Sequence, residues 1–302
     1  MSFSSIYESL LPALVVIATG YSLARWTGLS TAPLLKLLRY VFLPVYLLMT
    51  LKARMTFEMF FFVALIGGAI VGIGVLIQRN AHRIFKTQID ASVAIPNIAC
   101  FSIPIFALSW GGRGLGTACA LFAGVSFVAF FIEKKNVGAL FREPCIYAIV
   151  AGILLQKIRV SALPLDDILS PFMGATYPLL LLLLGASLHP FEGFTDLSAW
   201  VTAVLRVIIG FAVAMLGVSL FSVSPAIAAG AVMASMAPPA TKSLSMTGSA
   251  QDTNSSRAPS NVGLVVSLIV FGIFLSTGWQ PWYRGSVVSS APTSPSFEWP
   301  WE

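Results

Sequence analysis

Two apolar stretches decide the fold: IPNIACFSIP at residues 95–104 and MAPPATK at residues 236–242. Each places prolines and polar groups inside a run that is otherwise oily enough for a membrane helix. Proline lacks a backbone N–H and clashes with the preceding turn, so each stretch is expected to interrupt its helix. In hydrocarbon the freed carbonyls must find partners or line a cavity. Two such interruptions predict a binding site near the membrane midplane.

The composition is that of a polytopic membrane protein. Of 302 residues, 57% are hydrophobic and 10% are charged, and the mean hydropathy is +0.87. Soluble domains carry about 25% charged residues. The net charge of +6 does not indicate a nucleic-acid partner, because the basic residues lie in short loops between apolar runs. Cys100, Cys119 and Cys145 fall in or beside apolar runs and have no disulfide or metal spacing.

A span needs about 20 mostly apolar residues. On this basis we expect ten helices, at residues 10–27, 33–51, 57–78, 90–109, 114–132, 144–160, 168–188, 197–220, 225–248 and 261–279. Ten Lys and Arg residues follow odd-numbered segments, and six lie on the other side. This bias predicts that the first set is cytoplasmic and that both termini lie outside the cell membrane. Residues 280–302, rich in Ser, Pro and Trp, are expected to form an extramembrane tail.

The chain divides at a charged loop, residues 133–143, which we expect to be a cytoplasmic linker. The first half, 1–132, and the second, 144–279, then hold five segments each, so the second is inverted relative to the first. Landmarks recur at matching places: Pro12 with Pro144, Gly20 with Gly152, Pro44 with Pro178, and Pro104 with Pro238. The expected fold is all-α, with two inverted five-helix repeats whose fourth and ninth helices are broken and cross at the midplane.

Lys242 is the most unusual residue for a membrane segment. A lysine near the centre costs at least about 2.5–3.5 kcal/mol on insertion scales. It can be held by carbonyls freed at Pro238 and Pro239, or it can supply positive charge to an anionic substrate. The alternative without a functional role is a lysine that reaches the interface with its flexible stem, or one that loses its charge.

Asn97 lies shortly before Pro104, and its amide offers two donors and an acceptor. It can contact substrate or cap the half-helix that follows the break. Ser102 and Thr241 are weaker candidates, since such hydroxyls commonly bond the carbonyl one turn back.

Half-helices that begin near Pro104 and Pro239 would aim partial positive charge at the centre, which favours an anion. Arg206, about nine residues into the eighth segment, is expected to reach the nearer headgroups rather than bind substrate. The candidate substrate-binding residues are therefore Asn97, Ser102, Pro104, Pro238, Pro239, Thr241 and Lys242.

Sequence motifs of enzymes and pumps are absent from the chain. There is no H-E-x-x-H, no G-x-S-x-G, no P-loop and no intramembrane aspartate pair. We therefore expect neither an enzyme, nor a metal site, nor a cofactor.

Several short motifs together resemble the auxin efflux carrier family over residues 8–279. They are Gly20-Tyr21, Ala24-Arg25, Gly28-Leu29-Ser30, Phe42-Leu43-Pro44, the run Leu182–Leu188, Asn97 through Pro104 to Gly111, and Pro238-x-Ala240. The chain departs from the family at Ala99 and Ser102, where glycine is frequent, and at Lys242, where asparagine is frequent.

The resemblance implies an elevator-like or rocking carrier, or permease, for small organic anions. Auxin-like acids are substrates of some members, and malonate or other dicarboxylates of short-loop members. The short loop 133–143 fits the latter kind, in the inner membrane if the source is bacterial. The expected partners are the anion, the lipid bilayer and a second copy in a homodimer. Two alternatives stay open: a sodium-coupled symporter of the bile-acid type, and a membrane scaffold or channel that does not act as a carrier.

Overall fold

The structure is a computed structural model that describes residues 3–85, 89–109, 111–132, 141, 143–158, 165–191, 194–221, 223–240 and 257–276. Within these ranges the chain is all-helical, apart from one isolated β-bridge. Thr241, Lys242, most of the linker loop and the tail 280–302 lie outside the described residues, so the predictions made for them stay predictions.

The helices follow the predicted order along the chain. They are α1 (Phe3–Thr27), α2 (Thr31–Leu37), α3 (Leu43–Arg54), α4 (Phe57–Phe85), α5 (Ile103–Ser109), α6 (Gly111–Ile132), α8 (Pro144–Ile158), α9 (Leu165–Ser187), α10 (Leu197–Leu220), α11 (Pro225–Ser235) and α12 (Arg257–Ser276). Two π-helical turns, η1 (Leu38–Phe42) and η3 (Ile98–Ser102), and a 3-10 turn, η2 (Ala91–Ala94), complete them.

Each of the ten predicted ranges contains helix. Among the described residues, six helical stretches are long and apolar enough to cross a membrane: Leu10–Thr27, Thr31–Ala53, Phe57–Asn80, Gly114–Ile132, Asp166–Ser187 and Leu197–Leu220. Four shorter apolar helices account for the other predicted ranges. The description of the chain as a polytopic, all-helical membrane protein is thereby confirmed at this level.

Local sequence sets several helix ends. Gly28 adopts a φ of 63° directly after α1, and its N–H donates to the Ala24 carbonyl at 3.1 Å. Glycine adopts this positive φ without the steric cost in free energy that a Cβ would impose. Ser30 and Asp196 then begin α2 and α10, because each side chain accepts a hydrogen bond from an N–H of the first turn.

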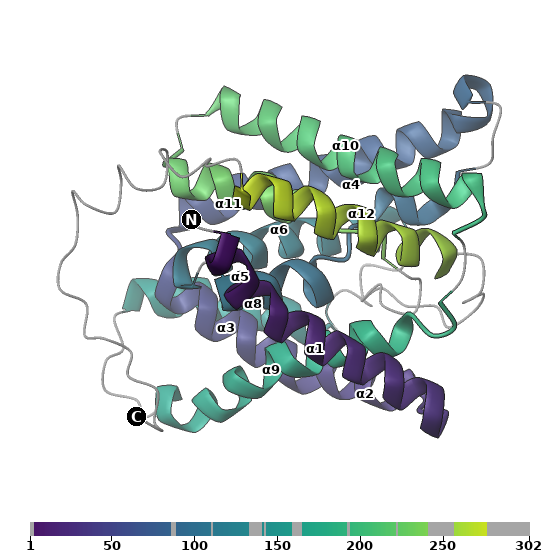
Figure 1. The fold of residues 1–302 in the computed structure, drawn as a ribbon. Helices are drawn as coiled ribbons and strands as arrows, with labels where there is room; N and C mark the ends of the chain where they lie inside the picture. Colours follow the sequence, from purple (N-terminus) through teal and green to yellow (C-terminus); the bar gives the residue numbers. More distant parts are fainter. Residues whose placement is uncertain are drawn as a thin grey trace.

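The helices form two groups, which Figure 1 shows in its lower and upper parts. The four-span group consists of α1, the continuous stretch α2–η1–α3, α8 and α9, in which α1 packs along α9 and α3 along α8. The crossing group consists of α4, η2, η3–α5, α6, α10, α11 and α12, in which α4 packs along α6 and α10 along α12. Each group therefore takes helices from both halves of the chain.

Glycines let backbones approach closely within each group. A Cβ built on Gly185 of α9 would lie 1.9 Å from the Ile17 carbonyl oxygen of α1, and one on Gly20 of α1 would lie 2.2 Å from the Leu182 carbonyl oxygen. Membrane helices use small residues in this way because lipid supplies no hydrophobic drive to bring them together. The α1–α9 contact is therefore a reciprocal backbone contact that leaves no room for side chains.

Pro44 and Pro104 each follow a π turn that accommodates the proline within a continuous helix. η1 ends two residues before Pro44, and η3 ends two residues before Pro104. At the end of each turn an N–H bonds five residues back, from Leu43 to Leu38 and from Ile103 to Ile98. This wider turn keeps the helix continuous where proline supplies no donor. The expectation that a half-helix begins near Pro104 is therefore wrong, and the break lies at Pro96.

We expect Gly185→Ala to destabilise the protein, because the added methyl group meets the α1 backbone, and relief requires the helices to separate. Overpacking of this kind costs about 1–3 kcal/mol. Thermal unfolding in detergent is the measurement. Gly174→Ala in the same helix is the matched control, since nothing lies within 4 Å of a Cβ there. Equal melting temperatures for the two variants would contradict the close α1–α9 packing.

Candidate functional site

The two interrupted segments meet backbone to backbone inside the crossing group. The Asn97 N–H donates to the Pro238 carbonyl at 2.8 Å, and the Ala240 N–H donates to the Ile95 carbonyl at 2.9 Å. Pro96 and Pro239 stand opposite each other between these bonds, in an antiparallel bridge. Both prolines are buried. The fourth and ninth predicted segments thus meet in a two-bond bridge, and this meeting point is the crossing.

The carbonyls at the end of α11 each find a donor from another element. Ser102 Oγ donates to the Ala234 carbonyl at 3.1 Å, and Ser267 Oγ donates to the Met236 carbonyl at 2.9 Å. Ser260 Oγ donates to the Pro239 carbonyl at 2.7 Å. An unpaired carbonyl in the interior would cost about 1–3 kcal/mol. The break is therefore held by hydroxyls from η3 and α12.

Asn97 is buried and forms the N-cap of η3. Its Oδ1 accepts from the Cys100 N–H at 3.3 Å, while its own backbone N–H makes the crossing bond. The capping interpretation of this residue is therefore observed. The start of η3–α5 brings the partial positive charge of a helix N-terminus to the crossing, beginning at Ile98.

The remaining candidates differ in where they lie. Ser102, Pro238 and Pro239 lie at the crossing and are buried, whereas buried Pro104 lies in the first turn of α5. Lys242 falls outside the described residues, as does Thr241. The carbonyls that Pro238 and Pro239 leave without a helical donor are those of Ala234 and Ser235, four residues earlier. They already accept from Ser102 and Arg206, so neither depends on Lys242 for a donor.

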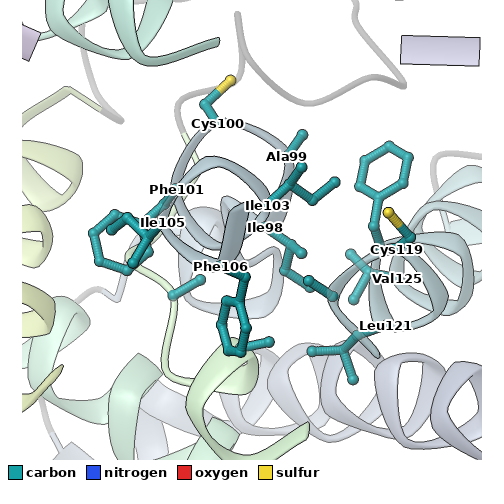
Figure 2. Packing of buried hydrophobic residues seen from close by; sticks show 14 of the residues in the cluster. Ile98, Ala99, Cys100, Phe101, Ile103, Ile105, Phe106, Cys119, Leu121 and Val125 are labelled. Carbon is teal, nitrogen blue, oxygen red and sulfur yellow. The ribbon is translucent and has the colours of Figure 1, made fainter. Parts of the chain in front are cut away.

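The half-helix after the crossing is embedded in apolar side chains. Figure 2 shows Phe101 and Ile105 on one flank of η3–α5, and Cys119, Leu121 and Val125 of α6 on the other. Phe101, Ile105, Cys119 and Leu121 are at most 2% exposed. This packing excludes water from the surroundings of the crossing, so charges and dipoles there act at low dielectric.

Arg206 is the site residue that sequence reasoning misjudged. Its side chain is 0% exposed, and its Nη2 donates to the Ser235 carbonyl at 2.9 Å. The expectation that it reaches the headgroups is wrong, because α10 turns this residue toward the end of α11. The sequence signal that pointed to it is the cost of any cation deep in an apolar segment.

An apolar groove of about 590 Å³ lies apart from the crossing, between α4, α6 and the start of α8. Phe61, Leu65, Phe127 and Val150 are among its lining residues, and Glu143 stands at its margin. Such an apolar lining provides few hydrogen-bond donors for a small polar anion.

Among the described residues no group of three or more His, Cys, Asp or Glu side chains is placed to hold a metal ion.

No protein-family model matches the chain, and no curated protein matches it in sequence. The geometry of the crossing and the sequence motifs are therefore the observations that bear on function.

Removing the hydroxyls that hold the break should weaken the fold. We expect Ser260→Ala and Ser267→Ala each to lower the free energy of unfolding by about 1–3 kcal/mol, since each orphans a buried carbonyl. Chemical denaturation in mixed micelles measures this. Ser219→Ala is the control, because its exposed hydroxyl bonds only within its own helix, to the Leu216 carbonyl. Variants that unfold like the control would show that the hydroxyls do not stabilise the break.

Proposed function

We propose that the protein is a secondary carrier that moves a small organic anion across the membrane by alternating access. The observation that carries the proposal is the bridge between Pro96 and Pro239, where two broken helices meet in the interior. Carriers bind substrate at such interruptions, because half-helix ends and freed backbone groups supply polar contacts inside hydrocarbon. The helix N-terminus at Ile98 favours negative charge there.

An inverted repeat of five plus five helices is part of the proposal, and two observations support it. Residues recur at a separation of 143 around the crossing: Gly67 with Gly210, Gly74 with Gly217, Ser92 with Ser235, and Pro96 with Pro239. The helix contacts recur too, since α4 packs along α6 as α10 packs along α12. The bridge pairs Pro96 with Pro239, so the expected correspondence of Pro104 with Pro238 is replaced by this one.

Pro44 and Pro178 lie 134 residues apart, whereas Pro96 and Pro239 lie 143 residues apart. This increase in separation has a structural explanation. α3 ends at Arg54 and α4 begins at Phe57, whereas α9 ends at Ser187 and α10 begins only at Leu197. The longer connection in the second half accounts for most of the difference.

The movement we infer is a displacement of the crossing group against the four-span group. The two ion pairs of the described residues support this division, because both lie within the four-span group. Lys52 Nζ meets Asp166 Oδ1 at 2.8 Å between α3 and α9, and Arg39 pairs with Glu143 between η1 and the start of α8. No ion pair between described residues joins the two groups, so none has to break when they slide.

The substrate contacts in this proposal are Asn97, Ser102 and the backbone at Pro238 and Pro239, with Thr241 and Lys242 on the continuation of the ninth segment. The motifs quoted above resemble the auxin efflux carrier family, and this resemblance makes malonate the first substrate to try. A homodimer stays a prediction.

The test is counterflow of radiolabelled malonate in proteoliposomes. We expect saturable uptake driven by internal malonate, because a carrier exchanges bound substrate between its two faces. Asn97→Ala should weaken apparent affinity about tenfold, equivalent to about 1.4 kcal/mol, and Lys242→Gln should weaken it if its charge contacts the anion. Asn80→Ala is the control, since its exposed amide bonds only to Leu76 in its own helix.

Three outcomes would overturn parts of this proposal. Linear flux without counterflow indicates a channel, and no flux for any small carboxylate indicates a scaffold. Uptake that stops when sodium is replaced by choline indicates a symporter of the bile-acid type.

The orientation is tested separately by fusions in a bacterial host. With both termini outside, a C-terminal alkaline phosphatase should be active and a C-terminal green fluorescent protein dark. A fusion truncated at residue 136, in the predicted cytoplasmic loop, should give the reverse pattern. Fluorescence from the full-length fusion would contradict the orientation derived from the Lys and Arg bias.

A further inference from the structure

A fully buried guanidinium lies beside the crossing. Arg206 of α10 donates one hydrogen bond from Nη2 to the Ser235 carbonyl at 2.9 Å, at the end of α11. Ser102 holds the preceding carbonyl, that of Ala234. Gly210, one turn further along α10, makes room for the group: a Cβ there would lie 3.2 Å from Arg206 Nη1. The guanidinium is thus built into the same half-helix end as the crossing.

Most of its hydrogen-bonding capacity is unused. Nε and Nη1 are buried and have no hydrogen-bond partner among the described residues. Neither of the two ion pairs in that part of the chain involves Arg206. A buried cation without a counter-ion is costly, and an ionisable group inside a membrane segment is by default a functional-site candidate.

Capping the end of α11 does not explain the charge. Three neighbouring carbonyls, those of Ala234, Met236 and Pro239, are satisfied by neutral serine hydroxyls. A hydroxyl would serve Ser235 equally well. The position 143 residues earlier, which the repeat relates to Arg206, is the fully buried Val63. The fold therefore does not require a cation at this position of the helix.

The open donors form a fork. The hydrogens of Nη2 point to two sides, one shared with Nε and the other with Nη1. Whichever hydrogen faces the Ser235 carbonyl, the other completes a parallel pair of donors with Nε or with Nη1. Such a pair matches the two oxygens of a carboxylate. Arg39 uses this arrangement on Glu143 elsewhere in the same protein.

We propose that Arg206 recognises a carboxylate of the transported anion, by a two-donor contact beside the crossing of the broken helices. This inference rests on the proposed carrier function and names the residue that selects the charge of its substrate. In this proposal Arg206 contacts the substrate directly. Its hydrogen bond to Ser235 fixes the orientation of the fork before the anion arrives, which lowers the entropic cost of binding.

Binding of malonate, monomethyl malonate, dimethyl malonate and inorganic phosphate to the full chain in lipid nanodiscs tests the proposal by calorimetry. We expect malonate and its monoester to bind, and the neutral diester and phosphate to bind at least tenfold more weakly. Arg206→Gln should reduce malonate affinity at least tenfold, and Arg206→Lys, which keeps the charge without the fork, at least threefold. Arg79→Gln is the matched control, because it removes one exposed arginine from α4 and should leave affinity within twofold.

The proposal is overturned if Arg206→Gln binds malonate like the wild type, if phosphate or the diester binds as tightly as malonate, or if the wild type binds no carboxylate. Should the glutamine variant not fold, Arg206→Lys decides, with unchanged affinity counting against the fork. Counterflow separates this proposal from the carrier function. Saturable counterflow that Arg206→Gln leaves unaltered refutes the role of Arg206 alone. Binding that depends on Arg206, without counterflow, refutes the carrier alone.

Discussion

The fold depends on how two interrupted helices satisfy their backbones in the interior. In hydrocarbon an unpaired N–H or carbonyl cannot form a hydrogen bond with water. A helix can therefore be interrupted there only where other protein groups replace the lost helical bonds. Here the segments partly satisfy each other, through the bonds from Asn97 to Pro238 and from Ala240 to Ile95. Serines of η3 and α12 supply most of the remaining donors. The crossing therefore fixes where α5, α11 and α12 stand.

Four prolines of the fourth, ninth and second segments show two different structural roles. Pro44 and Pro104 lie just after π turns, which widen the helix by one residue and keep it continuous. Pro96 and Pro239 lie opposite each other at the points where the fourth and ninth segments are not helical. The local sequence around a single proline such as Pro96 or Pro104 does not separate these outcomes. What distinguishes Pro96 is that its neighbours Ile95 and Asn97 pair with a distant segment of the chain, through Ala240 and Pro238.

The dependence on long-range pairing determines which features of the fold can be predicted from the sequence. The ten apolar ranges were predictable, because a helix in hydrocarbon satisfies its backbone within the segment and so marks itself by hydropathy alone. The interruption at 236–240 was predictable from its two adjacent prolines. The position of the first break was not, since it depends on Pro238 accepting from Asn97, across more than a hundred residues of chain.

Arg206 was beyond prediction for a related reason. Apolar residues surround it along α10, so periodicity does not say which face of the helix turns inward, and a long side chain can reach the headgroups from many positions. Packing decided the matter, because α10 lies against both α11 and α12 and turns this residue toward the Ser235 carbonyl.

The burial of Arg206 also bears on what the interior can accept. A guanidinium paired with a carboxylate costs less to bury than one whose donors are open. Arg39 meets this requirement by pairing with Glu143 in the four-span group, whereas Arg206 has no such partner among the described residues of the crossing group. A bound anion would therefore lower the cost of keeping this cation in the interior, and the free energy so gained would favour anions over neutral molecules of the same shape. The fixed charge would thus couple the stability of the crossing to the charge of a ligand bound beside it.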